Sequence, residues 1–192
     1  MTKQKVIAID VDLVLTNIIP KWHSWLLAQS LSFHEKRYNK DLQHERVDYN
    51  ITHYYELPMD VDGMDFWRQH DLYDDPKLLK YAKEVIMNWY MDGHELVFVS
   101  YCFQNHTDSK IKFLKHSLSF IADEDFHFIS TKSKGFVRAD VCLDDRNVFL
   151  NQMGNKTLCI KFHTPYTQCE EARQHYITYN NWKDLGEMFK GN

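Results

Sequence analysis

The chain has 192 residues, of which 44% are hydrophobic, and this composition is that of a globular protein with a substantial core. Its 23 lysines and arginines are outnumbered by 27 aspartates and glutamates, and the net charge of −4 argues against non-specific binding to nucleic-acid backbones, which requires a basic face. Only 6 glycines are present and neither GxGxxG nor GxxxxGK[ST] occurs, so we expect no Gly-rich phosphate loop.

The N-terminal segment and the cysteines bear on the cellular compartment. The apolar run at 6–9 is too short for the core of a signal peptide, and no stretch approaches the roughly 18 apolar residues of a membrane span. The cysteines, at positions 102, 142, 159 and 169, show no CxxC spacing. We therefore expect reduced, buried thiols in a cytoplasmic protein.

The first third of the chain contains one predicted strand and an insertion. Residues 5–9 form a short β-branched run typical of a strand buried on both faces, and Asp10 follows it directly. Aromatic residues, histidines and charges then mix over 18–75. Helical spacing of the aromatic and aliphatic residues predicts a helix over about 20–31, and a second is expected at 65–70. We interpret 18–75 as a mainly helical insertion whose aromatic residues mostly form a small core of its own.

From Pro76 onward, predicted helices and strands alternate. Apolar residues between 78 and 89 follow the amphipathic pattern of a helix that begins at Pro76 and ends before Gly93. A helix is also expected at 106–118, and another begins after the cap residue Asn181. Strands are predicted at 95–99, 126–129, 140–143 and 158–162. This alternation predicts an α/β fold, with a Rossmann-like parallel sheet sandwiched by helices.

Polar side chains stand where the predicted strands end. In parallel sheets ligands bind beyond the carboxyl ends of the strands, so we expect these groups to converge on one edge. They are Asp10 and Asp12, Ser100, the lysines at 132 and 134, and the pair Asp144-Asp145. Neighbouring carboxylates repel one another unless a cation lies between them. Hard oxygen ligands that are few in number favour Mg²⁺ bound together with a substrate phosphate.

These motifs resemble a known superfamily. The segment DVDLVLT at 10–16 resembles the DxDx[VT] nucleophile motif of the haloacid dehalogenase (HAD) superfamily of phosphatases, and the later Ser, Lys and Asp-Asp resemble its other motifs in the same order. The insertion, the run at 134–146, and segments FHTPY at 162–166 and NW at 181–182 are similar to the 5′(3′)-deoxyribonucleotidase family. The resemblance spans the chain and implies a HAD-like core of residues 1–17 and 76–192, with 18–75 as a cap.

The resemblance also implies roles in covalent chemistry. Asp10 would be the nucleophile that forms an aspartyl-phosphate, and Asp12 the general acid and base. Ser100 and Lys134 would bind the phosphate, with Lys132 as the alternative lysine. The chain departs from the family at Tyr101, where relatives carry a smaller residue, and at residues 16–17, where they are more apolar. Both departures are expected to flank the pocket.

The metal ligands and the substrate follow from the same resemblance. Asp10, the backbone carbonyl of Asp12 and Asp144 would hold Mg²⁺, and Asp145 would support that set from outside it. The implied activity is a Mg²⁺-dependent phosphomonoesterase that converts deoxyribonucleoside monophosphates, at the 5′ position and with the 3′ position as an option, to nucleoside and phosphate. The partner is thus a small nucleotide, with no nucleic-acid polymer and no membrane.

Several alternatives remain open at this point. The same chemistry could act on another small phosphomonoester, since the cap lining sets specificity. A receiver-like module is less favoured, because receivers carry the adjacent acidic pair at the first strand and the phosphorylated aspartate later, whereas here the Asp-Asp pair comes last. A non-catalytic phosphate-binding module is also less favoured, because no motif position is lost. One or two aromatic residues of the insertion could stack on a nucleobase. The sequence leaves the oligomeric state open, with a homodimer as one option.

Overall fold

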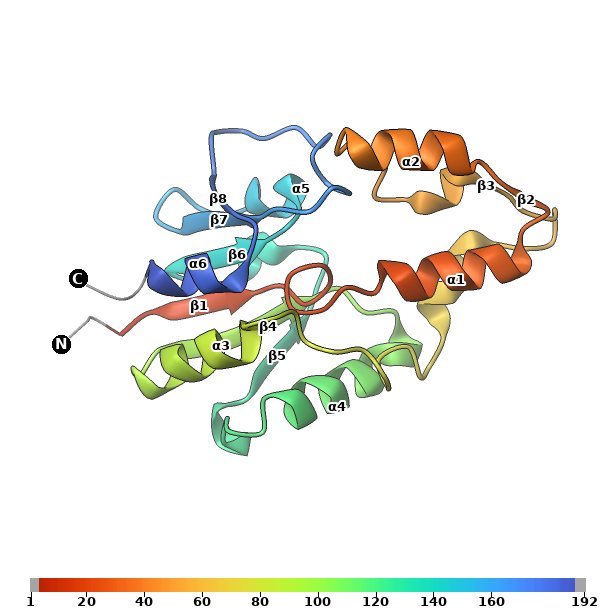
Figure 1. The fold of residues 1–192 in the computed structure, drawn as a ribbon. Helices are drawn as coiled ribbons and strands as arrows, with labels where there is room; N and C mark the ends of the chain where they lie inside the picture. The colour runs from red at the N-terminus through yellow and green to blue at the C-terminus, as the bar shows by residue number, and fades with distance from the viewer. Residues whose placement is uncertain (1–3, 189–192) are drawn as a thin grey trace.

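The computed structural model describes residues 4–188, and its centre is a six-stranded sheet in the order β5-β4-β1-β6-β7-β8 (Figure 1). All five strand pairings are parallel, which confirms the predicted α/β class. The strands are β1 (Val6–Ile9), β4 (Glu95–Ser100), β5 (His127–Ser130), β6 (Val141–Asp144), β7 (Leu158–Phe162) and β8 (Ile177–Tyr179). The first three and last four residues of the predicted core lie outside the described range.

The central strand β1 explains why the site lies where it does. Ile7 and Ile9 belong to one buried apolar cluster and Ala8 to another, so the alternation of side chains buries both faces of the strand. Helices α3 (Ala82–Met91), α4 (Thr107–Ser117) and α6 (Trp182–Glu187) contribute to the first cluster, and α5 (Asn147–Leu150) to the second. The ends of β1, β4 and β6 therefore meet at one edge of a rigid layer.

The helix predicted from Pro76 is wrong at its start, because α3 begins only at Ala82. Residues 76–79 are held by the loop after β1 instead: Leu79 donates a backbone hydrogen bond to Leu15, and Leu78 forms an isolated bridge with Thr16. The apolar periodicity that suggested an earlier start reflects packing of this extended segment on the core. The predicted end holds, since Gly93 follows the helix with φ +81°.

Other elements fall close to their predicted positions. Asn181 caps α6 through its side chain, which accepts from the Asp184 amide at 2.9 Å. The helix expected at 106–118 is α4, preceded by a 3₁₀ turn at Gln104–His106. Strand β8 was not predicted, because its three residues are too few to show a strand pattern. The expectation of buried cysteines is wrong for Cys169, which is exposed.

The segment between β1 and α3 contains more structure than predicted. Helix α1 (Ile19–Gln29) matches the expected first helix, whereas the second is a 3₁₀ turn at Gly63–Arg68. Helix α2 (Glu35–Gln43) was missed because only one of its residues is buried, and the two-stranded antiparallel sheet of β2 (Ser32–Phe33) and β3 (Tyr55–Glu56) was missed because its strands are so short. A further 3₁₀ turn spans Ile51–Tyr54.

The aromatic residues of this segment pack together, but not in a separate small core. Trp22 stacks on Phe66 with ring centroids 6.0 Å apart and meets Trp67 edge-on at 5.2 Å. All three belong to the same buried cluster as the sheet, so the expectation of an independent core is wrong. The segment thus forms one continuous hydrophobic body with the sheet.

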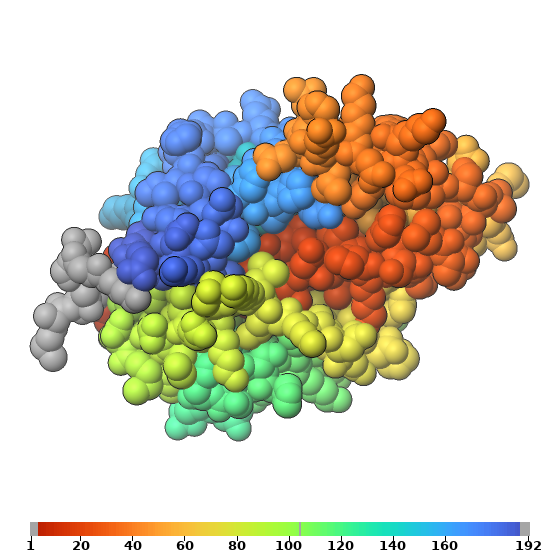
Figure 2. All heavy atoms as spheres, in the orientation of Figure 1, coloured from red at the N-terminus to blue at the C-terminus, as the bar shows by residue number. Residues whose placement is uncertain are grey.

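A second connection joins the segment to the C-terminal part of the chain. In Figure 2 the orange region around α2 lies against the blue segment that follows β7. Glu45 accepts from the His163 ring at 3.0 Å, and the hydroxyls of Tyr38 and Tyr166 lie 3.4 Å apart. These contacts position the inserted segment over the carboxyl edge of the sheet. Among the described helices, none has the length and apolarity needed to cross a membrane.

Candidate active site

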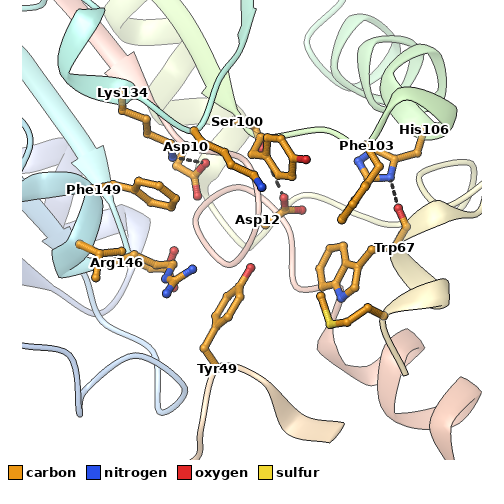
Figure 3. Close-up of a pocket in the computed structure, with 15 residues that line it drawn as sticks. Asp10, Asp12, Tyr49, Trp67, Ser100, Phe103, His106, Lys134, Arg146 and Phe149 are labelled. Carbon is orange, nitrogen blue, oxygen red and sulfur yellow. Dashed lines mark hydrogen bonds and ion pairs between the residues drawn. The ribbon is translucent and has the colours of Figure 1, made fainter. Parts of the chain in front are cut away.

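A cavity of about 390 Å³ lies between the carboxyl edge of the sheet and the inserted segment (Figure 3). Residues from both parts of the chain form its walls. They are Asp10, Asp12, Tyr49, Met64, Trp67, Ser100, Tyr101, Phe103, His106, Lys132, Lys134, Asp145, Arg146, Val148 and Phe149. Of the predicted site residues, only Asp144 is not part of this wall, and it lies directly behind it.

A tight turn directs the DxD pair toward the cavity. The Asp10 amide donates to Leu143 at 2.9 Å and so continues the pairing of β1 with β6. Leu13 then adopts φ +63°, and its amide donates to Thr16 at 2.7 Å, which reverses the chain just after Asp12. Thr16 itself is buried and donates its hydroxyl to Lys77, so it does not flank the cavity as predicted, whereas Tyr101 does.

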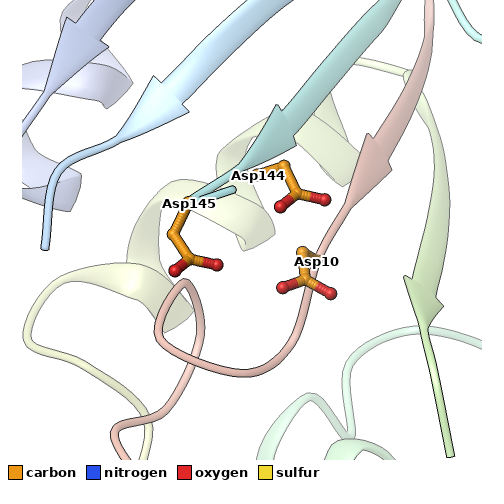
Figure 4. Close-up of side chains that lie close together, drawn as sticks. All are labelled: Asp10, Asp144 and Asp145. Atoms are coloured by element: carbon orange, nitrogen blue, oxygen red, sulfur yellow. The ribbon is translucent and has the colours of Figure 1, made fainter. Parts of the chain in front are cut away.

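Three carboxylates, shown in Figure 4, form the acidic half of the site together with one lysine, which Figure 3 shows. Asp10, Asp144 and Asp145 are buried, and each offers an oxygen within 4.8 Å of the others. The buried Lys134 ammonium donates to Asp10 Oδ1 at 2.7 Å and to Asp144 Oδ2 at 2.6 Å. The second Asp144 oxygen accepts from the Arg146 amide at 2.9 Å. Within the described residues, Asp145 Oδ2 is buried without a hydrogen-bond partner.

The electrostatics of this half indicate an excess of negative charge. Burial raises the pKa of Asp10 to about 7, and the charge of Lys134 opposes the shift without cancelling it. Burial, followed by repulsion from Asp144 and Asp10, holds the pKa of Asp145 well above its usual range. Burial disfavours the Lys134 ammonium, but its two carboxylate partners outweigh this effect and raise its pKa. The single ammonium of Lys134 therefore does not neutralise three buried carboxylates.

The other half of the site is built around Asp12. Its Oδ2 accepts from Lys110 Nζ at 2.7 Å and from Ser100 Oγ at 3.3 Å, and its Oδ1 accepts from the Tyr73 hydroxyl. Burial raises the pKa of Asp12, but the charge and hydrogen bond of Lys110 prevail, so the pKa is lowered overall. Asp12 thus lies in a locally neutral pair.

Lys110 was missed by the sequence analysis, although a signal for it existed. Its position three residues before Phe113 and four before Leu114 puts it on the buried face of α4. Of the two lysines considered, Lys134 contacts the carboxylates, whereas Lys132 is exposed and lies over the Tyr101 ring at 4.3 Å.

The remaining wall of the cavity is largely aromatic. Tyr49 and Trp67 come from the inserted segment, and Phe103 follows β4. The Arg146 guanidinium lies 4.0 Å from the centroid of the Tyr49 ring, and Glu170 accepts from it at 2.6 Å. The contact between Arg146 and Tyr49 joins the core to the inserted segment directly across the cavity.

The parallel α/β sheet is that of the HAD-like hydrolase fold. A DxD pair, a serine, a lysine and an Asp-Asp pair at its carboxyl edge are the arrangement expected of that class. The chain shares this fold with a HAD-like hydrolase from Burkholderia xenovorans LB400, at a TM-score of 0.58 and 16% identity over 96% of this chain and 95% of that one. A solved dehalogenase covers 100% of both chains at a TM-score of 0.55 and 8% identity. A dehalogenase solved with an intermediate complex matches at a TM-score of 0.57 and 9% identity, again over 100% of both chains.

Within that class, residues 4–190 match the family model described as 5′ nucleotidase, deoxy (Pyrimidine), cytosolic type C protein. The chain belongs to this family, and it is a nucleotidase-type phosphatase. The resemblance inferred from the motifs is thereby confirmed. A comparison with curated proteins gave no match.

Proposed function

We propose that the chain hydrolyses deoxyribonucleoside monophosphates to nucleoside and inorganic phosphate through an aspartyl-phosphate on Asp10. The 5′-phosphate is the first candidate position and the 3′-phosphate the second. The observation that carries the proposal is the convergence of Asp10, Asp12, Ser100 and Lys134 in one cavity that also has an aromatic wall. The free, buried thiols at positions 102, 142 and 159 support a cytoplasmic location for this activity.

In the first step, an Asp10 oxygen attacks the phosphorus and the ester bond to the sugar oxygen breaks. Lys134 holds Asp10 Oδ1, so the other oxygen is the one free to form the new bond. Burial raises the pKa of Asp12 but Lys110 lowers it overall in the free protein, so Asp12 acts as the acid only when it carries a proton, such as the one it takes from water in the preceding turnover. It gives this proton to the leaving sugar oxygen, and the nucleoside departs as a neutral alcohol. Ser100 donates to a phosphate oxygen, and the Lys134 ammonium offsets negative charge that develops during the transfer.

In the second step, water attacks the phosphorus of the aspartyl-phosphate. Asp12, now a carboxylate, takes a proton from that water, and the bond between phosphorus and the Asp10 oxygen breaks. Inorganic phosphate leaves, and Asp10 returns to its starting state. Because the same carboxyl serves as acid and then base, its orientation must suit both steps.

The acidic half of the site fits a divalent cation. Asp10 and the Asp12 carbonyl remain candidate ligands, and Asp144 was predicted as the third with Asp145 behind it. The contacts favour Asp145 instead, since its Oδ2 is buried without a partner and it lines the cavity, whereas both oxygens of Asp144 accept hydrogen bonds. Mg²⁺, when bound, would neutralise phosphate charge and polarise the bond to be broken. Hard carboxylate and carbonyl oxygens suit this ion.

The aromatic wall supports a nucleoside as the leaving group. Stacking of a base on an aromatic side chain contributes about 1–3 kcal/mol. Tyr49, Trp67 and Phe103 offer such faces within the same cavity as the carboxylates. A cavity of about 390 Å³ falls within the range that small ligands occupy. A sugar phosphate alone would leave these faces uncovered.

A panel of phosphomonoesters, assayed with Mg²⁺ and with EDTA, tests the proposal. We expect dUMP or dTMP to be hydrolysed faster than sugar phosphates, and EDTA to abolish the turnover. The Asp10→Asn variant should be inactive while retaining the melting behaviour of a folded protein. Equal or better turnover of sugar phosphates would replace the nucleotidase proposal with the more general phosphatase reading, and an active Asp10→Asn variant would refute Asp10 as the nucleophile.

A further inference from the structure

A second buried lysine lies beside the cavity without lining it. Lys110, on α4, has no exposed surface, and its ammonium contacts both Asp12 and Ser100. It is absent from the cavity wall, so it does not contact a ligand there. The DxD pair therefore has one buried lysine for each carboxylate, with Lys134 at Asp10 and Lys110 at Asp12.

The contacts of Lys110 use the full donor capacity of its ammonium. The three acceptors are Asp12 Oδ2 at 2.7 Å, Ser100 Oγ at 2.9 Å and the Tyr101 carbonyl at 3.5 Å. An ammonium has three N–H donors, so each of them has an acceptor. Burying a charge is unfavourable unless it is paired and hydrogen-bonded, and an apolar residue would fill the same space at lower cost. This arrangement indicates a role beyond packing.

The arrangement fixes two groups that the proposed reaction uses. Because Lys110 donates to Ser100 Oγ, the serine hydroxyl is left to donate its own hydrogen, to Asp12 or to a phosphate oxygen. Because Lys110 holds Asp12 Oδ2 while the Tyr73 hydroxyl holds Oδ1, both oxygens of that carboxyl are restrained. Rotation of the carboxyl would break at least one of these contacts.

We propose that Lys110, with Tyr73, is a positioning residue for the acid and base step. It holds the Asp12 carboxyl toward the leaving oxygen and makes the Ser100 hydroxyl a donor toward the phosphate. This inference rests on the proposed function, since it assigns a role within that reaction. A positioning role differs from a purely structural one in a measurable way. The loss of kcat/KM when Lys110 is replaced should be larger for a substrate whose leaving group needs a proton.

The test compares kcat/KM for two esters, because this ratio reports the first phosphoryl transfer. A deoxyribonucleoside 5′-phosphate has a poor leaving group that requires the proton of Asp12, whereas p-nitrophenyl phosphate has one that leaves without it. General acid catalysis contributes about 10²–10⁴-fold. We expect K110M to lose about 100-fold or more on the nucleotide and about 10-fold on the aryl ester, where only Ser100 is affected. The exposed Lys112 on the same helix provides the matched control, and K112M should change neither value.

Two further variants keep the test decisive. Y73F retains the ring and removes only the hydroxyl that donates to Asp12. It should lose about 10-fold in kcat/KM on the nucleotide and almost nothing on the aryl ester. This variant tests the proposal even if K110M does not fold. In a D12N background, K110M should lose no more on the nucleotide than it loses on the aryl ester. A crystal structure of K110M should show the Asp12 carboxyl turned away from Ser100.

Equal losses on the two esters for K110M or Y73F would overturn the positioning role. So would an undiminished nucleotide loss in the D12N background, or an unchanged Asp12 carboxyl in the K110M crystal structure. A wild-type protein that hydrolyses aryl and sugar phosphates but not nucleotides would refute the proposed substrate while leaving the Lys110 test intact on a sugar phosphate. Inactivity of the wild type toward every ester would overturn both proposals.

Discussion

Asp145→Asn is expected to stabilise the metal-free protein while it abolishes activity and the response to Mg²⁺. The side chain is buried, its Oδ2 has no hydrogen-bond partner in the described residues, and its pKa is raised by burial and by the neighbouring carboxylates. An amide of the same shape removes the charge and provides an N–H group that can donate to a neighbouring carboxylate. Folding then no longer has to force three carboxyl groups together.

The magnitude follows from the spacing. The oxygens of Asp10, Asp144 and Asp145 lie within 4.8 Å of one another. Two unit charges at that distance repel by about 3.5 kcal/mol at an effective dielectric constant of about 20. Lys134 offsets part of this repulsion, and proton uptake by the carboxyls with raised pKa relieves more, so we expect a gain of about 2 kcal/mol at pH 8. In a chain of this length that corresponds to about 4–8 °C in Tm.

Thermal unfolding at pH 8, in EDTA and with millimolar Mg²⁺, measures the effect. The wild type should have the lower Tm in EDTA and gain stability with Mg²⁺, because a ligand that binds only the folded state stabilises it. The variant should have the higher Tm in EDTA and no response to the ion. Asp60→Asn, at an exposed position, is the control and should match the wild type. A variant less stable than the wild type in EDTA, or one with an undiminished Mg²⁺ response, would refute the reasoning.

Three further predictions follow from the same structure. The folded protein keeps a proton on Asp10 up to a pKa of about 7, whereas the unfolded chain loses it near 3.8, so stability in EDTA should fall by up to about 1.4 kcal/mol per pH unit between these values. Melts across that window check this, and a rising Tm would contradict it. Lys134→Met leaves its carboxylate partners uncompensated and should cost about 3–5 kcal/mol in chemical denaturation along with the activity, whereas Lys132→Met should leave stability unchanged. Equal effects would rule out the distinction between the two lysines. Gly186→Ala places a Cβ 2.7 Å from Val85 Cγ2 and should cost about 1–3 kcal/mol by overpacking, and a neutral result in the same assay would show that α6 can shift.

The residues that could be predicted from the sequence are those that directly follow buried strands. The apolar run of β1 is interrupted by Asp10, and β4 and β6 end at Ser100 and Asp144. A polar residue at the end of such a run must lie at the carboxyl edge of the sheet, whatever the details of the fold. Strand periodicity therefore placed most of the acidic half of the site without any knowledge of the inserted segment.

The residues that escaped prediction depend on how a helix or a loop packs. The apolar spacing of helix α4 marks Lys110 as inward-facing, but it does not reveal that the ammonium reaches Asp12 and Ser100. Tyr73 and Tyr49 lie in irregular backbone, where no period marks which side chains turn inward. Both approach the carboxylates through folding of the inserted segment and its connections. Sequence patterns carry little information about such long-range contacts.

A charge count explains why only one half of the site fits a metal ion. Asp12 and Lys110 form a neutral pair, and Arg146 is paired with Glu170, so neither demands a cation. The acidic half has three carboxylates and the single ammonium of Lys134, which leaves two negative charges when all are ionised. One divalent ion balances them. A dianionic phosphate entering the metal-free cavity would be repelled by that excess negative charge. We therefore expect that substrate binding, and not only catalysis, requires the ion.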